Sequence, residues 1–114
     1  MTTPVGPYTP IVRTGDWLVT SGQIGLRDGA MVEGFGAQVD QLLANLSDRL
    51  AEHGLDLTDV IKTTCMLVDL DRFAEFNERY AAAFPEPRPA RSAFGVAALP
   101  LGASVEVEAW ALRR

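Results

Sequence analysis

The stretch EPRPARSAFGVAALPLGASVEVEAW, residues 86–110, organises the rest of the chain. Pro85, Pro87 and Pro89 end any helix before them, because proline lacks an amide donor and biases the preceding residue toward extended conformations. Arg91 is therefore expected at the start of a strand. A guanidinium mounted in this way presents a fixed fork of donors, which suits a carboxylate or a phosphate.

The end of this stretch alternates between apolar and polar residues over Ser104–Leu112, as a strand with one buried face does. Glu106 and Glu108 fall on the polar face, roughly 7 Å apart for a rise of ~3.3 Å per residue. If the Arg91 strand pairs with this one as a hairpin around Pro100–Gly102, the cation and the carboxylates meet in one pocket.

Toward the N-terminus, residues 1–10 carry three prolines and a glycine and are expected to form an extended arm. Strands are predicted over 11–13 and 17–21 as a hairpin, and Asp28-Gly29 indicates a turn. An amphipathic helix is predicted from Phe35 onward, with Gly54 as its C′ residue. Its apolar stripe is Phe35, Val39, Leu42, Leu43, Leu46 and Leu50.

The segment Val60–Val68 is β-branched and apolar on both faces, which favours a central strand covered on both sides. A second helix is predicted with Asp71 as N-cap and Pro85 as its stop. The order is therefore β-β-α-β-α-β-β, and right-handed connections would place both helices on one face of a single sheet. The opposite face then lacks a cover, which favours a closed homo-oligomer.

Composition narrows the function classes. The 114 residues are enough for one domain, spanning 1–114, and the net charge of -5 disfavours nucleic acid and anionic membranes as partners. Cys65 is the only cysteine, which excludes an internal disulfide and a multi-cysteine zinc site. No signal peptide or membrane-spanning run is recognisable, so a cytoplasmic location is expected.

Several motifs together resemble the Rid family, the reactive intermediate deaminases typified by RidA. The match covers nearly the whole chain, and the order and spacing of the motifs make it specific. The motifs are GPYTP at 6–10, VTSGQIGL at 19–26, DVIKTTCML at 59–67, FAEFNERYAAAF at 73–84, PARSAF at 89–94 and ALPLGASVEVEAWA at 98–111.

This resemblance implies a chorismate-mutase-like α+β fold, with one mixed sheet, two helices on one face and three copies forming a trimeric barrel with clefts between subunits. It also implies hydrolysis of short-lived 2-imino and 2-enamino acids, such as 2-aminoacrylate and 2-iminopropionate, to a 2-keto acid and ammonia. That chemistry needs no cofactor and no metal.

Carried over residue by residue, the resemblance implies that Arg91 holds the substrate carboxylate. Glu106 orients and partly deprotonates the attacking water and returns a proton to the departing nitrogen. The residues implied to line the cleft are Tyr8, Ser21, Gly22 and, through its backbone, Ala93. The chain departs from the family pattern at Thr9-Pro10 and at Ala93, Phe94 and Gly95, which puts the substrate in question more than the reaction.

Other interpretations stay open at this point. Arg91 is also compatible with a structural ion pair to Glu106 or Glu108 across a subunit interface. A protein that binds 2-keto acids or similar carboxylates without turnover would need Arg91 but not Glu106. A role directed at RNA is disfavoured by the acidic charge.

Three further residues are interpreted as structural. They are His53 at a helix end, Cys65 within a strand and Asn77 on the second helix.

Overall fold

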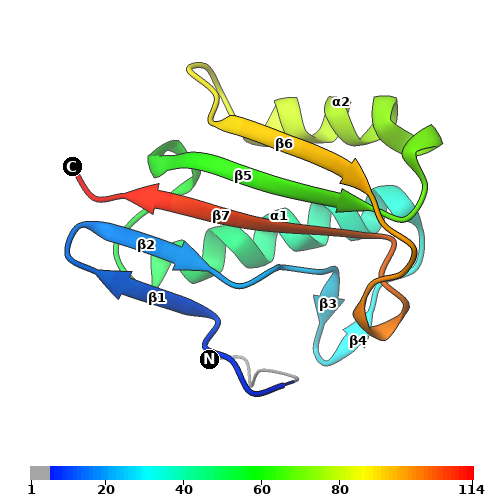
Figure 1. Cartoon of the computed structure of the whole chain (residues 1–114), viewed down its shortest axis with the longest axis horizontal. Helices are drawn as coiled ribbons and strands as arrows, with labels where there is room; N and C mark the ends of the chain where they lie inside the picture. Colours follow the sequence, from blue (N-terminus) through cyan, green and yellow to red (C-terminus); the bar gives the residue numbers. More distant parts are fainter. Residues whose placement is uncertain (1–5) are drawn as a thin grey trace.

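A computed structural model of the chain describes residues 6–114, which form a five-stranded mixed sheet and two long helices (Figure 1). The strand order is β1-β2-β7-β5-β6. The strands are β1 Ile11–Thr14, β2 Trp17–Thr20, β5 Val60–Leu67, β6 Ala90–Gly95 and β7 Val105–Leu112. The α+β class is confirmed, and the predicted order of elements is confirmed apart from two short additional strands before α1.

The predicted hairpin of β1 and β2 is present, and a second, two-stranded hairpin joins β3 Leu26–Arg27 to β4 Ala30–Met31. The second hairpin turns at Asp28-Gly29, where φ is 54° and 82°. Two positive φ values in a two-residue loop define the turn that best matches the twist of its flanking strands. The turn was predicted, whereas its two short strands were not.

The strand that carries Arg91 does not pair with the strand that carries Glu106. β6 runs parallel to β5, and β5 lies between β6 and the antiparallel β7. The conditional hairpin of the two strands is therefore wrong. A helix separates β5 from β6 along the chain, and such a crossover brings the second strand back parallel to the first.

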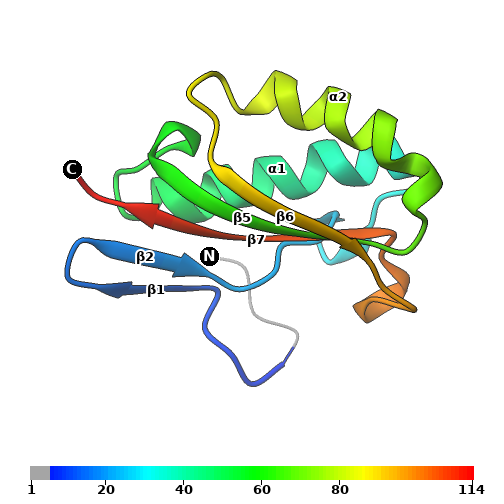
Figure 2. The same ribbon diagram turned by 45° about the horizontal axis from the view of Figure 1, so that its top comes forward.

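Helices α1, Phe35–Ala51, and α2, Phe73–Ala83, both lie on one face of the sheet (Figure 2). The core fills the space between these helices and the sheet, and its largest fully buried side chains include Phe76, Phe84 and Leu46. Gly54 follows the end of α1 as the predicted C′ residue, with a φ of 73°. The amide of Leu55 donates to the Leu50 carbonyl at 3.0 Å, and Gly54 donates to Ala51 at 3.1 Å, which is the Schellman arrangement.

The N-terminus of α2 differs from the prediction. The N-cap of α2 is Arg72, which makes no side-chain capping bond, and Asp71 lies inside the short 3₁₀ turn η2, Leu70–Arg72, that precedes the helix. The Asp69 carboxylate caps this turn by accepting from the Asp71 amide at 3.0 Å. The chain enters the helix through this extra turn, so the capping side chain stands two residues earlier.

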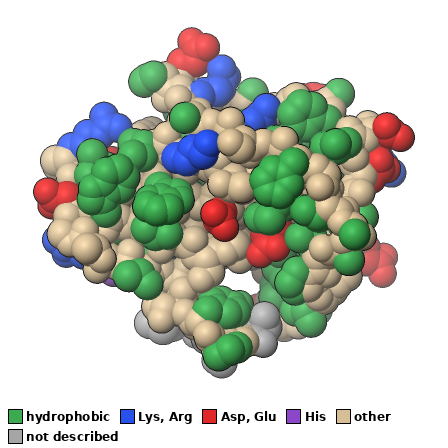
Figure 3. Space-filling view, in the orientation of Figure 1, with side chains coloured by type: hydrophobic (Ala, Val, Ile, Leu, Met, Phe, Trp, Pro, Cys, Tyr) green, Lys and Arg blue, Asp and Glu red, His purple; other side chains and the backbone are tan. Residues whose placement is uncertain are grey.

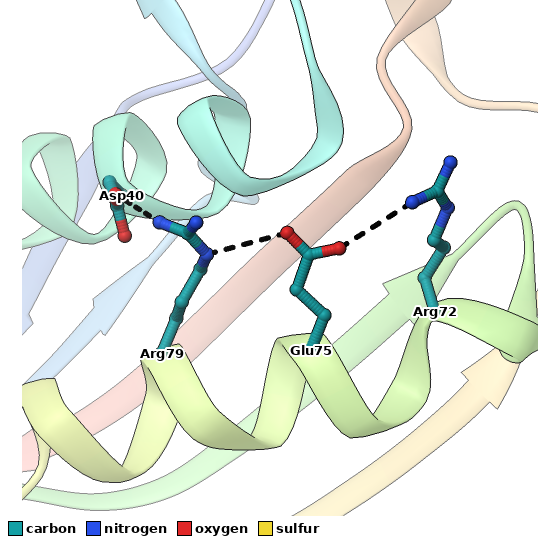
Figure 4. Close-up of polar contacts among 4 residues, drawn as sticks. All are labelled: Asp40, Arg72, Glu75 and Arg79. Atoms are coloured by element: carbon teal, nitrogen blue, oxygen red, sulfur yellow. Dashed lines mark hydrogen bonds and ion pairs between the residues drawn. The ribbon is translucent and has the colours of Figure 1, made fainter.

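A chain of ion pairs joins the two helices on their outer side (Figure 4). Glu75 contacts Arg72 at 3.5 Å and Arg79 at 3.6 Å, and Arg79 also contacts Asp40 of α1. Exposed pairs of this kind contribute little stability each.

The other face of the sheet carries no helix. Four of the large exposed hydrophobic side chains lie on it by strand register: Val12, Trp17, Phe94 and Trp110. Figure 3 shows this face, where hydrophobic side chains lie on both sides of acidic ones. β5 is thus covered on one face only, and its predicted coverage on both faces is wrong for a single copy of the chain.

The extended arm predicted for residues 1–10 lies partly outside the described residues. From residue 6 onward, no helix is both long and apolar enough to cross a bilayer.

Candidate active site

Glu106 stands near the beginning of β7, on the open face of the sheet, and its side chain is half-buried. The segment of residues 21–23 lies next to β7 and contacts the Glu106 side chain. Gln23 donates its amide to the Val107 carbonyl at 2.7 Å and accepts from the Val107 amide at 3.1 Å. This single bridge holds residues 21–23 against the strand and brings Gly22 next to the Glu106 side chain.

Gly22 allows this close approach because it has no side chain. A Cβ built on Gly22 would lie 1.9 Å from Oε2 of Glu106 and 2.6 Å from Cδ. Contacts this short do not occur, so any larger residue at position 22 must displace the carboxylate. The family resemblance implied that Gly22 lines the cleft, and the structure identifies the Glu106 carboxylate as the group that approaches it.

The pKa of Glu106 is raised above the ordinary value of 4.5, firstly by burial and secondly by the negative charge of Glu108. A carboxylate with a raised pKa is a better base than a solvated one and holds a proton closer to neutral pH. Glu106 is therefore suited to exchange a proton with a reacting molecule.

Tyr8 and Ser21 lie with Gly22 and Glu106 around one cavity of about 560 Å³. The Ser21 hydroxyl donates to the Thr9 carbonyl at 2.7 Å, and the Ser21 amide donates to the Pro10 carbonyl at 2.9 Å. These bonds fasten the loop that presents Tyr8, a residue that is 44% exposed. Four of the six predicted site residues are thus brought together.

Arg91 is not part of this cavity. It stands opposite Thr63 in the register of β6 and β5, and Thr63 is buried on the helix side, where its hydroxyl shares a hydrogen bond of 2.7 Å with Tyr80. Arg91 therefore points toward α2, on the face opposite to Glu106. Two strand spacings and three residues of offset separate the two positions by roughly 14 Å.

Ala93 follows Arg91 on the same face of β6 and packs against the hydrophobic core beside Cys65. Its side chain packs at the border of the core, and its backbone belongs to β6, an edge strand of the sheet. Cys65 is buried, and burial raises the pKa of its thiol, in keeping with the structural role expected for it.

Asn77 is the residue near the site that sequence reasoning had placed among the structural ones. Its Oδ1 accepts a hydrogen bond of 2.8 Å from Nη1 of Arg91. The signal was available in the spacing, since Asn77 lies one turn from both Phe73 and Tyr80 and so shares their face of α2.

Within residues 6–114, no group of three or more His, Cys, Asp or Glu side chains is arranged to hold a metal ion.

The fold and the cavity define a class: an α+β protein with a mixed sheet, two helices on one face and a half-buried glutamate on the other. The family model described as Endoribonuclease L-PSP matches residues 1–113. The crystal structure of RidA from Psychrobacter sp. PAMC 21119 superposes with a TM-score of 0.95 at 39% identity, covering 96% of this chain and 91% of that one.

Curated relatives agree with the structural match. The 2-iminobutanoate/2-iminopropanoate deaminase of Salmonella typhimurium is 41% identical over 115 residues, covering 96% of this chain and 90% of the relative. Reactive Intermediate Deaminase A, chloroplastic, of Arabidopsis thaliana is 43% identical over 107 residues, which cover 91% of this chain and 57% of the plant protein's length. The chain belongs to the Rid family.

Proposed function

We propose that this chain hydrolyses reactive 2-imino and 2-enamino acids, such as 2-iminopropionate and its tautomer 2-aminoacrylate. The observation that carries the proposal is Glu106, half-buried beside Gly22 with its pKa raised, at a cavity open to small molecules. The names of its relatives in Salmonella and Arabidopsis support this chemistry.

The proposed reaction adds water across the C=N bond and then expels ammonia. Glu106 takes a proton from the water as its oxygen attacks the imine carbon and passes that proton to the nitrogen, which gives a carbinolamine. It then takes the hydroxyl proton of the carbinolamine and gives it to the nitrogen as the C–N bond breaks and the C=O bond forms. The products are one 2-keto acid and one ammonia per imine and water consumed. An imine is already electrophilic, so holding a water near its carbon supplies much of the acceleration.

Arg91 is proposed to bind the substrate carboxylate as a bidentate pair. Since Arg91 and Glu106 face opposite sides of the sheet, one copy cannot place both groups on a three-carbon substrate. We therefore propose a homotrimer in which Arg91 of one copy completes the cavity of its neighbour. Such an assembly would also cover the exposed hydrophobic side chains of the open face.

The experiment generates 2-iminopropionate with an amino-acid oxidase acting on alanine and follows pyruvate formation. Wild type should accelerate hydrolysis, whereas Arg91→Ala and Glu106→Gln should each lose most of the acceleration. Glu78→Gln, the same substitution at an exposed carboxylate of α2, is the matched control and should retain turnover. A protein that binds pyruvate through Arg91 without accelerating hydrolysis would instead be a carboxylate-binding protein.

Mixing the two inactive variants tests the shared site. If Arg91 and Glu106 come from adjacent copies, random trimers formed from equal amounts of Arg91→Ala and Glu106→Gln contain intact sites wherever the right neighbours meet. The chance that a site receives an intact Arg91 from one copy and an intact Glu106 from its neighbour is one half times one half, so about a quarter of wild-type activity should return. No recovery after confirmed subunit exchange would contradict a site built from two copies.

A further inference from the structure

The environment of Arg91 differs from that of the other arginines near the helices. Arg49, Arg72, Arg79 and Arg88 are each ion-paired with a carboxylate. Among the residues that the structure describes, the hydrogen bond recorded for Arg91 goes instead to the neutral amide of Asn77, from Nη1 to Oδ1 at 2.8 Å. A carboxylate in that place would neutralise the guanidinium, whereas an amide orients it and leaves its charge available.

The rings of α2 fix the guanidinium further. The Arg91 Cζ lies 4.9 Å from the ring centroid of Tyr80, 5.2 Å from Phe73 and 5.9 Å from Phe76. Distances within about 6 Å are those of cation–π contacts, which hold the group without competing for its N–H donors. Tyr80 is itself held by its hydroxyl contact with buried Thr63.

One helix face thus supplies two restraints on one side chain. The rings limit where the guanidinium lies, and Asn77 engages Nη1, which sets its rotation. The edge formed by Nη2 and Nε then remains to donate two parallel hydrogen bonds. That edge matches the two oxygens of a planar carboxylate.

We propose that Asn77 is a positioning residue that orients Arg91 to receive a planar monocarboxylate edge-on. This inference rests on the proposed function only in taking Arg91 as the carboxylate-binding group. It extends that function by assigning selectivity for the carboxylate to α2 rather than to the cavity that contains Glu106.

The test compares binding of pyruvate with binding of pyruvamide, which has the same shape without the negative charge, by titration calorimetry. Wild type should prefer pyruvate. Asn77→Ala should weaken pyruvate binding about 10-fold or more, the range for a hydrogen bond to a charged group, and leave pyruvamide unchanged. Asn77→Asp, nearly the same size, should weaken pyruvate binding further because its carboxylate competes for Arg91.

Glu78→Ala is the matched control, since Glu78 is the exposed neighbour of Asn77 on α2. It should bind both ligands as wild type does. In the imine assay, Asn77→Ala should raise KM with little change in kcat, whereas Glu106→Gln lowers kcat.

Two results would overturn the inference. The first is equal weakening of both ligands by Asn77→Ala and Asn77→Asp, as general damage to the helix would cause. The second is pyruvate binding that is unaffected by Asn77→Ala or by Arg91→Ala. The deaminase proposal fails separately. If the wild-type protein does not accelerate imine hydrolysis, the deaminase proposal is refuted. If Asn77→Ala nevertheless loses the preference for pyruvate over pyruvamide, the positioning role is supported.

Discussion

Replacing Gly22 by alanine tests whether the position of Glu106 matters for turnover. The new Cβ would lie 1.9 Å from Oε2 of Glu106 and 2.8 Å from its Cγ, whereas ordinary contact begins near 3.4 Å. The carboxylate oxygen must therefore move by about 1.5 Å, the difference between 3.4 and 1.9 Å. The backbone has no reason to move, because Gly22 is not among the glycines with positive φ.

The expected effect on catalysis is large and the effect on folding small. A misplacement of ~1 Å can cost about 100-fold in rate, so kcat/KM should fall at least that far, or about 2.7 kcal/mol. The Gly→Ala change raises the free energy of unfolding by about 0.4–1 kcal/mol, because the unfolded chain has less conformational freedom. It loses about 0.5–1.5 kcal/mol if Glu106 leaves its preferred rotamer, so the two contributions nearly cancel.

The assay is the coupled formation of pyruvate from 2-iminopropionate, run beside chemical denaturation. Gly15→Ala is the control with the opposite expectation. Nothing lies within 4 Å of its Cβ, but its φ of 61° is strained for alanine, so it should lose roughly 1–2 kcal/mol of stability and keep its turnover. If Gly22→Ala kept wild-type turnover, the placement of Glu106 beside Gly22 would not matter for the reaction.

Burial and then the charge of Glu108 raise the pKa of Glu106, so the folded state binds this proton more tightly than the unfolded state does. Ionisation of Glu106 therefore lowers the free energy of unfolding as the pH rises. Glu106→Gln should accordingly melt higher than wild type at neutral pH, with no difference below pH 4.5; a constant difference would contradict the shift. Thr63→Val should cost about 1–3 kcal/mol in denaturant unfolding, because it leaves the buried Tyr80 hydroxyl unpaired, whereas the double variant with Tyr80→Phe should recover part of that loss. Trp110→Glu places a charge on the open face and should shift sedimentation toward smaller species; an unchanged coefficient would contradict burial of this face by assembly.

The sequence was most informative where periodicity is strong. The stripe from Phe35 to Leu50 predicted α1, and its C′ glycine was placed correctly, because the left-handed conformation at Gly54 has a clear residue preference. Alternation in β7 likewise predicted which face carries Glu106. The N-terminus of α2 was misplaced because Asp69 and Asp71 are both good caps, and the sequence does not show that a 3₁₀ turn containing Asp71 precedes the helix.

Contacts across elements were harder to predict. The amino-acid sequence of residues 21–23 does not indicate that this segment forms a β-bridge to Val107, yet that bridge places Gly22 against Glu106. Asn77 had been interpreted as a structural residue, whereas its side chain accepts a hydrogen bond from Arg91. Knowing that β6 lies beside β5, and not beside β7, would have placed Arg91 next to α2 and suggested the contact.

The strand order also changes what the site requires. A hairpin of β6 and β7 would have put Arg91 and Glu106 into one pocket of one copy, and the site would have been complete in a monomer. With β5 inserted between them, the cation faces α2 and the carboxylate faces the open side of the sheet. Under the proposed mechanism, catalysis through both groups depends on a second copy, so dilution or an interface mutation should abolish turnover while each copy stays folded.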